Sequence, residues 1–193
     1  MELDYRTILW ILTIIIWIYA YYPYIRDILK WSTKPHLFSW IVFLIMDTIA
    51  FLIQITNNAG PWAWGTLVTG LMWLSVVILA FKHGEKNITL SDSVAFCFAL
   101  ICIGLYLFVE DATYSLYTVL IISGLAMYPT MRKSYHKPNE ETLSNYALAW
   151  VRSAISIIAT INISLLTIWL PAFVIFINTI FITMVLIRRK QLK

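Results

Sequence analysis

Charged residues are scarce in this chain. Asp, Glu, Lys and Arg make up 12% of its 193 residues, whereas a soluble globular domain carries about 25%. Cysteine is rarer still: the two thiols, Cys97 and Cys102, fall in one apolar segment, and their spacing fits neither a disulfide framework nor a metal site. The low charge argues against an ordinary soluble domain, and the cysteines give no support to a thiolate metal centre.

Long apolar runs take the place of charge. Hydrophobic residues account for 61% of the chain, and the mean hydropathy is +0.79. An excess of this size over the whole length predicts that most of the chain lies in lipid. Because the runs are continuous rather than alternating, we expect membrane-spanning helices and not the strands of a barrel.

The polar breaks between these runs predict seven transmembrane helices. The weakest break lies between the last two, where only Ser, Asn and Thr interrupt the apolar residues. Without it, 143–187 would be one helix, far longer than the roughly 20 residues that cross a bilayer. The predicted spans are 7–22, 38–56, 63–81, 92–109, 113–129, 143–161 and 166–187.

Lys and Arg predict the orientation. All of them except Arg6 and Arg152 fall in the loops after the first, third and fifth spans or in the C-terminal tail. The positive-inside rule then places the N-terminus outside and the C-terminus in the cytoplasm. We expect an integral protein of the plasma (inner) membrane whose basic loops contact anionic lipid, and the charge pattern gives little support to nucleic-acid binding.

A segment of the chain recurs 106 positions later. Tyr22–Arg26 (YPYIR) returns as Tyr128–Arg132 (YPTMR), and in the same register Leu37–Trp40 (LFSW) falls on Leu143–Tyr146 (LSNY). Each copy begins at the end of one apolar segment and leads through a basic loop into the next. Repeats of this kind are typical of transporters, in which two related bundles enclose a substrate site.

The repeat predicts the domain organisation. Three spans precede and three follow a single inverting span, so the two halves have the same orientation and are related by an axis along the membrane normal. We therefore predict an all-α membrane protein with a 3+1+3 plan. Its parts are a first three-helix bundle (1–87), a linker helix (88–112) and a second three-helix bundle with a basic cytoplasmic tail (113–193).

The repeated motif resembles that of the SWEET and PQ-loop membrane transporters. Their signature is Pro-Gln near the cytoplasmic end of the first helix of each bundle, followed by a basic stretch. Here Pro23-Tyr24 and Pro129-Thr130 stand in its place, which indicates a diverged, bacterial-type member without either glutamine. The resemblance implies a carrier whose two bundles rock about a small solute, such as a sugar or another small polar metabolite.

The same resemblance implies substrate contacts in the middle of the membrane. An Asn in the last helix of a bundle contacts substrate in SWEET-like proteins, and Asn178 matches it, whereas its repeat position in the first half is Met72. Small polar residues within spans also form ordinary helix–helix hydrogen bonds. The predicted substrate-binding residues are Asn178, Trp73, Gln54, Asn162 and Thr69.

Two charges lie deep in predicted spans. Asp47 and Arg152 are each about ten residues into a span. In the 106-residue repeat Asp47 is equivalent to Ser153, which is the residue after Arg152. Charges in a bilayer are costly unless they are paired or line water. We expect an Asp47–Arg152 ion pair, acting as a gate or as a static staple; a proton taken up by Asp47 during transport is a further hypothesis.

Pro23 and Pro129 occupy matched places late in the first span of each half. Proline removes a backbone donor and kinks a helix. The pair is therefore predicted either to form hinges or to mark the helix ends.

No constellation indicates catalysis, a metal or a cofactor. His36, His83 and His136 fall in separate loops, and nothing in the sequence groups them with an acid or a cysteine. A rhodopsin-type photoreceptor is disfavoured because the last span lacks a lysine for retinal. A non-transporting receptor or assembly partner and a vitamin-precursor carrier of the PnuC type stay open. The predicted functional unit is a monomer, and a homo-oligomer is the alternative.

Overall fold

The computed structural model describes residues 5–56, 61–108, 111–160 and 164–192. Within these residues the chain is all-α, with seven α-helices, one short 3-10 helix (Pro138–Glu140) and no strand. The helices are α1 (Tyr5–Leu29), α2 (Leu37–Thr56), α3 (Pro61–His83), α4 (Leu90–Tyr106), α5 (Ala112–His136), α6 (Leu143–Ala159) and α7 (Leu165–Gln191).

Every predicted span coincides with one helix, but α1 and α5 extend well beyond theirs. Pro23 and Pro129 lie inside these helices, which continue to Leu29 and His136. The prediction that the prolines mark helix ends is therefore wrong, and their role as hinges stays a prediction. The last turns of both helices carry basic residues, which the sequence analysis placed in loops because they are polar. These residues can be helical because a charged side chain at a helix end still finds partners outside the apolar layer.

Helix starts follow from side-chain caps. Thr89 and Asp92 form a capping box at α4, and Ser164 and Thr167 form one at α7. Asp111 caps α5 by accepting hydrogen bonds from the backbone of the first turn. These caps satisfy amide donors that have no partner within the helix.

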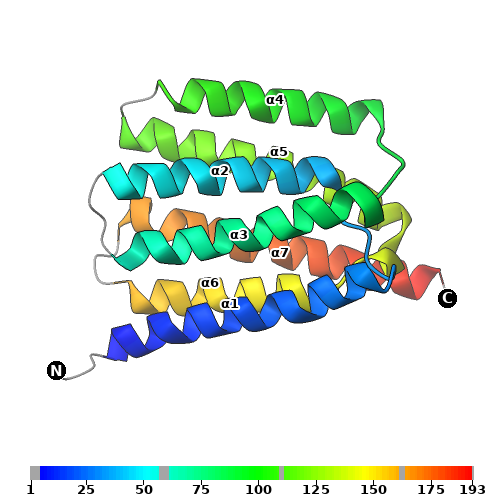
Figure 1. The fold of residues 1–193 in the computed structure, drawn as a ribbon, viewed down its shortest axis with the longest axis horizontal. Coiled ribbons are helices and arrows are strands. Elements are labelled where there is room, and N and C mark those ends of the chain that lie inside the picture. Colours follow the sequence, from blue (N-terminus) through cyan, green and yellow to red (C-terminus); the bar gives the residue numbers. More distant parts are fainter. Residues whose placement is uncertain (1–4, 57–60, 109–110, 161–163, 193) are drawn as a thin grey trace.

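Six of the helices pack in a closed ring, and α4 lies outside it (Figure 1). Around the ring the order is α1, α3, α2, α5, α7, α6 and back to α1. The pattern is unchanged when the first three helices are exchanged for α5, α6 and α7, so the packing has the same two-fold character as the sequence repeat. α4 packs against α5 and α2.

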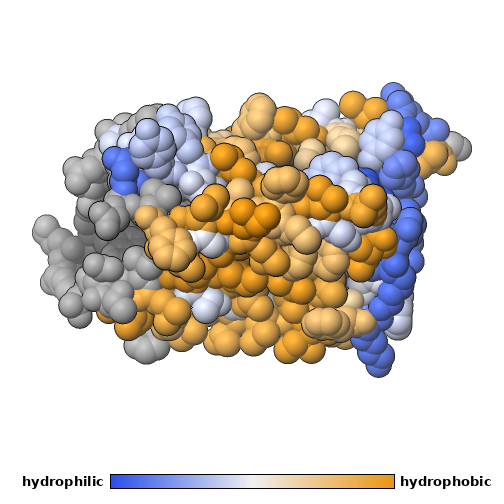
Figure 2. Space-filling model, turned by 90° about the horizontal axis from the view of Figure 1, so that it is seen from above, coloured by the Kyte–Doolittle hydropathy of each residue, from blue (hydrophilic) through white to orange (hydrophobic). Residues whose placement is uncertain are grey.

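The outside of the ring is apolar around its middle and charged at one end. Figure 2 shows a broad hydrophobic band and a hydrophilic rim at the end where the C-terminus lies. Among the described residues, the helical segments Thr66–His83 and Thr167–Gln191 are long and apolar enough to cross a membrane, and Leu37–Leu52 and Leu90–Tyr106 are apolar but shorter. By itself, this finding supports a membrane location only weakly.

The core is rich in aromatic rings. Its main cluster includes Trp17, Tyr24, Trp40 and Phe181 and draws on all six helices of the ring. A second cluster joins α4 to α2 and α5 through small side chains such as Ala99 and Ala126. The aromatic cluster therefore occupies the inside of the ring, where the candidate site also lies.

Candidate functional site

A group of five side chains lies at half the height of the ring, and we call it the central cluster. It consists of Trp17 and Tyr21 on α1, Asp47 on α2, Trp73 on α3 and Arg152 on α6. All except Tyr21 stand within one residue of the middle of their helix. Four helices, α1, α2, α3 and α6, thus bring two charges and two tryptophan rings to one depth, and Tyr21 lies four residues further along α1.

Aromatic contacts organise the central cluster. The guanidinium carbon of Arg152 lies 4.0 Å from the centre of the Trp17 ring, a cation–π contact. Trp17 meets Tyr21 edge-on at 5.1 Å between ring centres, and Trp73 at 6.5 Å. Phe43 supports Trp73 from α2 at 5.2 Å. These rings hold the polar atoms of the cluster in fixed positions.

The polar atoms of the central cluster lack hydrogen bonds. Trp17 Nε1, Tyr21 OH, Asp47 Oδ2, Trp73 Nε1 and Arg152 Nε are buried without a well-aligned hydrogen-bond partner in the described part of the chain, although Tyr21 OH and Trp73 Nε1 lie close enough to interact with each other. Each such atom costs about 1–3 kcal/mol. Natural proteins satisfy nearly all buried polar groups, so several orphans around one point indicate a place for a polar ligand or for water.

The expected Asp47–Arg152 ion pair is absent from this structure. The two charges are near enough to influence each other electrostatically, but Asp47 Oδ2 and Arg152 Nε both remain without a partner. The physical reason is that α2 and α6 are not neighbours in the ring. Arg152 instead places its guanidinium over Trp17, a residue that the sequence analysis did not select.

The other predicted site residues are only partly assembled. Thr69 is half-buried on α3, one position before Gly70, whose backbone approaches the Asp47 side chain. Asn178 stands in the middle of α7 and is 6% exposed, but no described contact joins it to the central cluster. The Gln54 side chain and all of Asn162 lie outside the described residues.

The charged end of the ring is closed by a network of ion pairs and hydrogen bonds, some of which join the two halves of the chain, and we call this network the seal. Its most buried member is Lys133 on α5, whose ammonium lies 2.5 Å from Glu141 Oε2. The same ammonium donates to the carbonyl oxygens of Lys34 at 2.9 Å and Glu140 at 3.0 Å. Its three hydrogens are thus satisfied, and they join the α1–α2 loop to the segment before α6.

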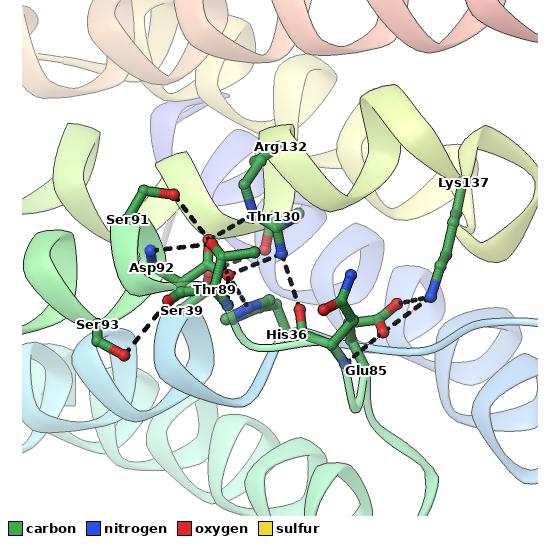
Figure 3. A network of polar contacts seen from close by, with 11 residues as sticks. His36, Ser39, Glu85, Thr89, Ser91, Asp92, Ser93, Thr130, Arg132 and Lys137 are labelled. Atoms are coloured by element: carbon green, nitrogen blue, oxygen red, sulfur yellow. Dashed lines mark hydrogen bonds and ion pairs between the residues drawn. The ribbon is translucent and has the colours of Figure 1, made fainter.

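A second part of the seal joins α5 to α4 (Figure 3). Arg132 holds Asp92 with two bonds, Nε to Oδ1 and Nη2 to Oδ2, both 2.7 Å. Its Nη2 also donates to the Asn87 carbonyl at 3.0 Å. Paired bonds of this geometry are among the strongest between side chains, so Arg132 fixes the start of α4.

Further contacts join the two halves, and one of them places repeat-equivalent positions against each other. Lys34 and Glu140 are 106 positions apart, which is the repeat distance, and they meet through a 2.5 Å ion pair. The hydroxyls of Thr33 and Thr142 are 2.5 Å apart, and Thr142 donates to Asp27 at 2.9 Å. The contact between Lys34 and Glu140 is the kind that forms where a two-fold axis passes between two related halves.

Glu85 and Lys137 complete the seal at its rim. Both carboxylate oxygens of Glu85 lie 2.9 Å from the Lys137 ammonium, and Oε1 accepts a hydrogen bond from the backbone N–H of Asn87 at 2.7 Å. Burial alone would raise the pKa of Glu85, but these hydrogen bonds outweigh it and hold the pKa below its ordinary value. Glu85 therefore stays ionised and keeps its bond to α5.

His36 lies against Asp92, contrary to the expectation that no histidine is grouped with an acid. Its Nε2 is 3.3 Å from Asp92 Oδ2, although the ring is not aligned for a hydrogen bond. Burial lowers the pKa of His36; Asp92 opposes this, whereas Arg132 and Lys133 add to it, and the net pKa is lowered. His36 is fully buried and stays neutral where a free histidine would begin to protonate.

Mild acid should therefore destabilise the protein through His36. When the folded pKa is lowered, the unfolded state binds the proton first, so stability falls as the pH drops below about 6.5. We expect a lower melting temperature at pH 5.5 than at pH 7.5, and a smaller difference in His36→Gln. His136→Gln, on an exposed side chain, is the matched control. An equal pH dependence in the wild type and His36→Gln would contradict this assignment.

Comparisons with known proteins identify no family. No protein-family model, no curated protein and no solved structure matches the chain.

Sequence reasoning missed the seal and the aromatic half of the central cluster. The basic loops were assigned to topology alone, yet Asp27, Glu85, Asp92, Glu140 and Glu141 stand in or beside the same loops. Half of the ten acids therefore share one end with the cations, and this was the available signal for an ionic network. No group of three potential metal ligands occurs in the described ranges.

Proposed function

We propose that the protein is a membrane carrier for a small polar solute, which works by alternating access between two three-helix bundles. The observation that carries this proposal is the central cluster: two half-buried charges without an ion pair, together with buried donors, at half the height of a ring that ionic contacts close at one end. A ligand site at mid-depth beneath a closable end is what alternating access requires.

The arrangement of the helices supports the two-bundle plan. α3 packs between α1 and α2, and α7 packs between α5 and α6. The contacts between the two groups, α1 with α6 and α2 with α5, are exchanged by the same two-fold relation. In this proposal α4 is the inverting linker, which packs on α5 and also on α2, so its contact with α2 would have to shift as the first bundle rocks against the second.

Membrane placement is part of the proposal. The apolar band in Figure 2 would face lipid, and the hydrophilic rim would lie in the cytoplasm with the basic tail. α1, α3, α5 and α7 all end at the charged end, because the loops and ion pairs of the seal connect their C-terminal ends. The N-terminus is then outside, in agreement with the distribution of Lys and Arg.

The seal supports a gating role for the charged end. Buried ion pairs are costly to break from one side but give one defined arrangement when all members are satisfied. Lys34–Glu140 and Thr33–Thr142 join the two halves directly. Their separation would open the central cluster towards the cytoplasm, and in this proposal the arrangement with these contacts in place corresponds to the form that is closed at this end.

Transport is tested with purified protein in lipid vesicles. Uptake of radiolabelled sugars, amino acids, nucleosides and vitamin precursors is compared with uptake into protein-free vesicles, and internal unlabelled solute is used to detect exchange. We expect at least one solute to enter only with the protein and to exchange with its internal pool. Absence of flux for every class would overturn the carrier proposal and favour a non-transporting receptor or assembly partner.

A further inference from the structure

We propose that the central cluster binds a small zwitterion, with the ammonium group of the solute at Asp47 and its carboxylate at Arg152. This inference rests on the proposed function for its biological meaning, since it names the solute class of the same site. It is derived from charge balance, from the count of donors and acceptors, and from the aromatic walls.

Charge balance excludes a solute with a single charge. The site holds one carboxylate and one guanidinium that are not paired with each other. A simple cation would neutralise Asp47 and leave Arg152 buried without a counter-charge, and a simple anion would do the reverse. Either state is expensive in a water-poor interior. A zwitterion neutralises both charges and leaves the net charge of the membrane interior unchanged.

The two charges lie on helices at opposite positions of the ring, as a solute that bridges them requires. Asp47 and Arg152 come from α2 and α6, which are not in contact, and each presents an atom without a partner. A neutral sugar could accept and donate hydrogen bonds here, but it carries no charge that would compensate Asp47 or Arg152. The observed orphan atoms are thus explained by a ligand that carries both signs.

The numbers of unpaired donors and acceptors in the central cluster indicate which groups the solute must supply. The orphans comprise the donors Trp17 Nε1, Trp73 Nε1 and Arg152 Nε, the Tyr21 hydroxyl, and a single acceptor, Asp47 Oδ2. Tryptophan and arginine only donate. The solute must therefore supply more acceptors than donors to the cluster, which a carboxylate with two oxygens does and a polyamine does not.

Two of these orphans belong to side chains that are more than nine-tenths buried. Trp17 is 8% exposed and Tyr21 is 4% exposed. Their polar atoms cannot reach bulk water without movement, so a bound solute or a trapped water must satisfy them. The indole faces next to them form an apolar wall for the carbon skeleton of the solute and add a cation–π contribution to an ammonium group.

Binding to the purified wild-type protein distinguishes the solute classes. The probes are glycine, γ-aminobutyrate and phenylalanine as zwitterions, N-acetylglycine as the anion, glycinamide as the cation and glucose as the neutral solute. We expect at least one zwitterion to raise the melting temperature and to bind at least tenfold more tightly than either of its singly charged analogues. Stabilisation by glucose and by no zwitterion would overturn the inference.

Two variants test the assignment of each end. Asp47→Asn should weaken zwitterion binding at least tenfold and affect binding of the anion N-acetylglycine less. Arg152→Gln should also weaken zwitterion binding at least tenfold, and here binding of the cation glycinamide should be less affected. Asp111→Asn and Lys190→Gln are matched controls, because Asn caps a helix as well as Asp does and Lys190 is exposed. Equal losses for every probe in both site variants would contradict the assignment.

The outcomes separate this inference from the carrier proposal. Zwitterion binding without flux in vesicles would support the inference and overturn the carrier. Flux of a neutral solute without zwitterion binding would support the carrier and overturn the inference. Zwitterion binding with zwitterion flux would support both.

Discussion

Replacing Lys133 with Met should lower the free energy of unfolding by about 3–5 kcal/mol. The substitution leaves the Glu141 carboxylate buried without its counter-charge and removes the donor to two backbone carbonyls. For a chain of this size the expected fall in melting temperature is roughly 10 °C. Thermal unfolding of purified protein measures it.

The double variant Lys133→Met/Glu141→Gln tests whether the loss of stability comes from the Glu141 carboxylate left without its counter-charge. The double variant removes both charges, so it should recover a large part of the stability that the single variant loses. Lys190→Met, on an exposed side chain near the end of α7, is the control and should melt with the wild type. If Lys133→Met also melted within about 2 °C of the wild type, the seal would contribute nothing to this form of the protein.

Replacing Arg152 with Met should preserve stability and reduce solute binding, which is the opposite of the effect of Lys133→Met. The reason is that polar atoms of the central cluster lack hydrogen-bond partners in this structure. The variant removes a buried orphan donor and keeps a side chain that can pack on Trp17. We expect the melting temperature to stay the same or to rise. Solute binding and uptake should fall by about 10–100-fold, the value of a lost hydrogen bond to a charged group.

The measurements for Arg152→Met are a thermal melt without solute and initial uptake rates in vesicles. Lys190→Met is again the control. A strong loss of stability without solute would mean that Arg152 is a structural staple. Normal uptake would mean that the central cluster is not on the solute path.

The difference between the two variants follows from hydrogen-bond satisfaction. Lys133 has all its partners within the protein, so its removal costs stability. Arg152 has a buried nitrogen without a partner, so its cost is already present in the folded state. Functional sites commonly retain such unfavourable groups at the expense of stability. The seal also has buried atoms without a partner, Glu140 Oε2 and Glu141 Oε1, so the contrast applies to Lys133 and Arg152 and not to every atom of the two networks.

The helices could be predicted because hydropathy alone determines them. Seven apolar runs with polar breaks gave all seven helices, and the 106-residue repeat placed Asp47 and Arg152 at the same depth in equivalent helices. The ends of α1 and α5 were wrong by about one or two turns, since Arg26 and Arg132 are polar yet helical. Hydropathy reports the apolar layer, while the helix ends depend on the contacts of the charged side chains.

The side-chain contacts of both sites could not be predicted in the same way. The Asp47–Arg152 pair was inferred from equal depth, but pairing also depends on which helices are neighbours in the ring, and the sequence does not contain that order. Trp17 looks like any lipid-facing tryptophan until the ring places it under Arg152. The seal joins loops about 100 residues apart, and no local pattern reports such contacts.

Disulfide cross-linking across the seal tests the central claim most directly. Thr33 and Thr142 belong to different halves, and their hydroxyl oxygens are 2.5 Å apart, so Cys at both positions should be close enough to bond. With Cys97 and Cys102 replaced by Ala, Thr33→Cys/Thr142→Cys should lose uptake when oxidised and regain it with reductant, whereas Thr33→Cys alone should be insensitive. Full uptake by a completely cross-linked protein would contradict the account, because the charged end would then not need to open.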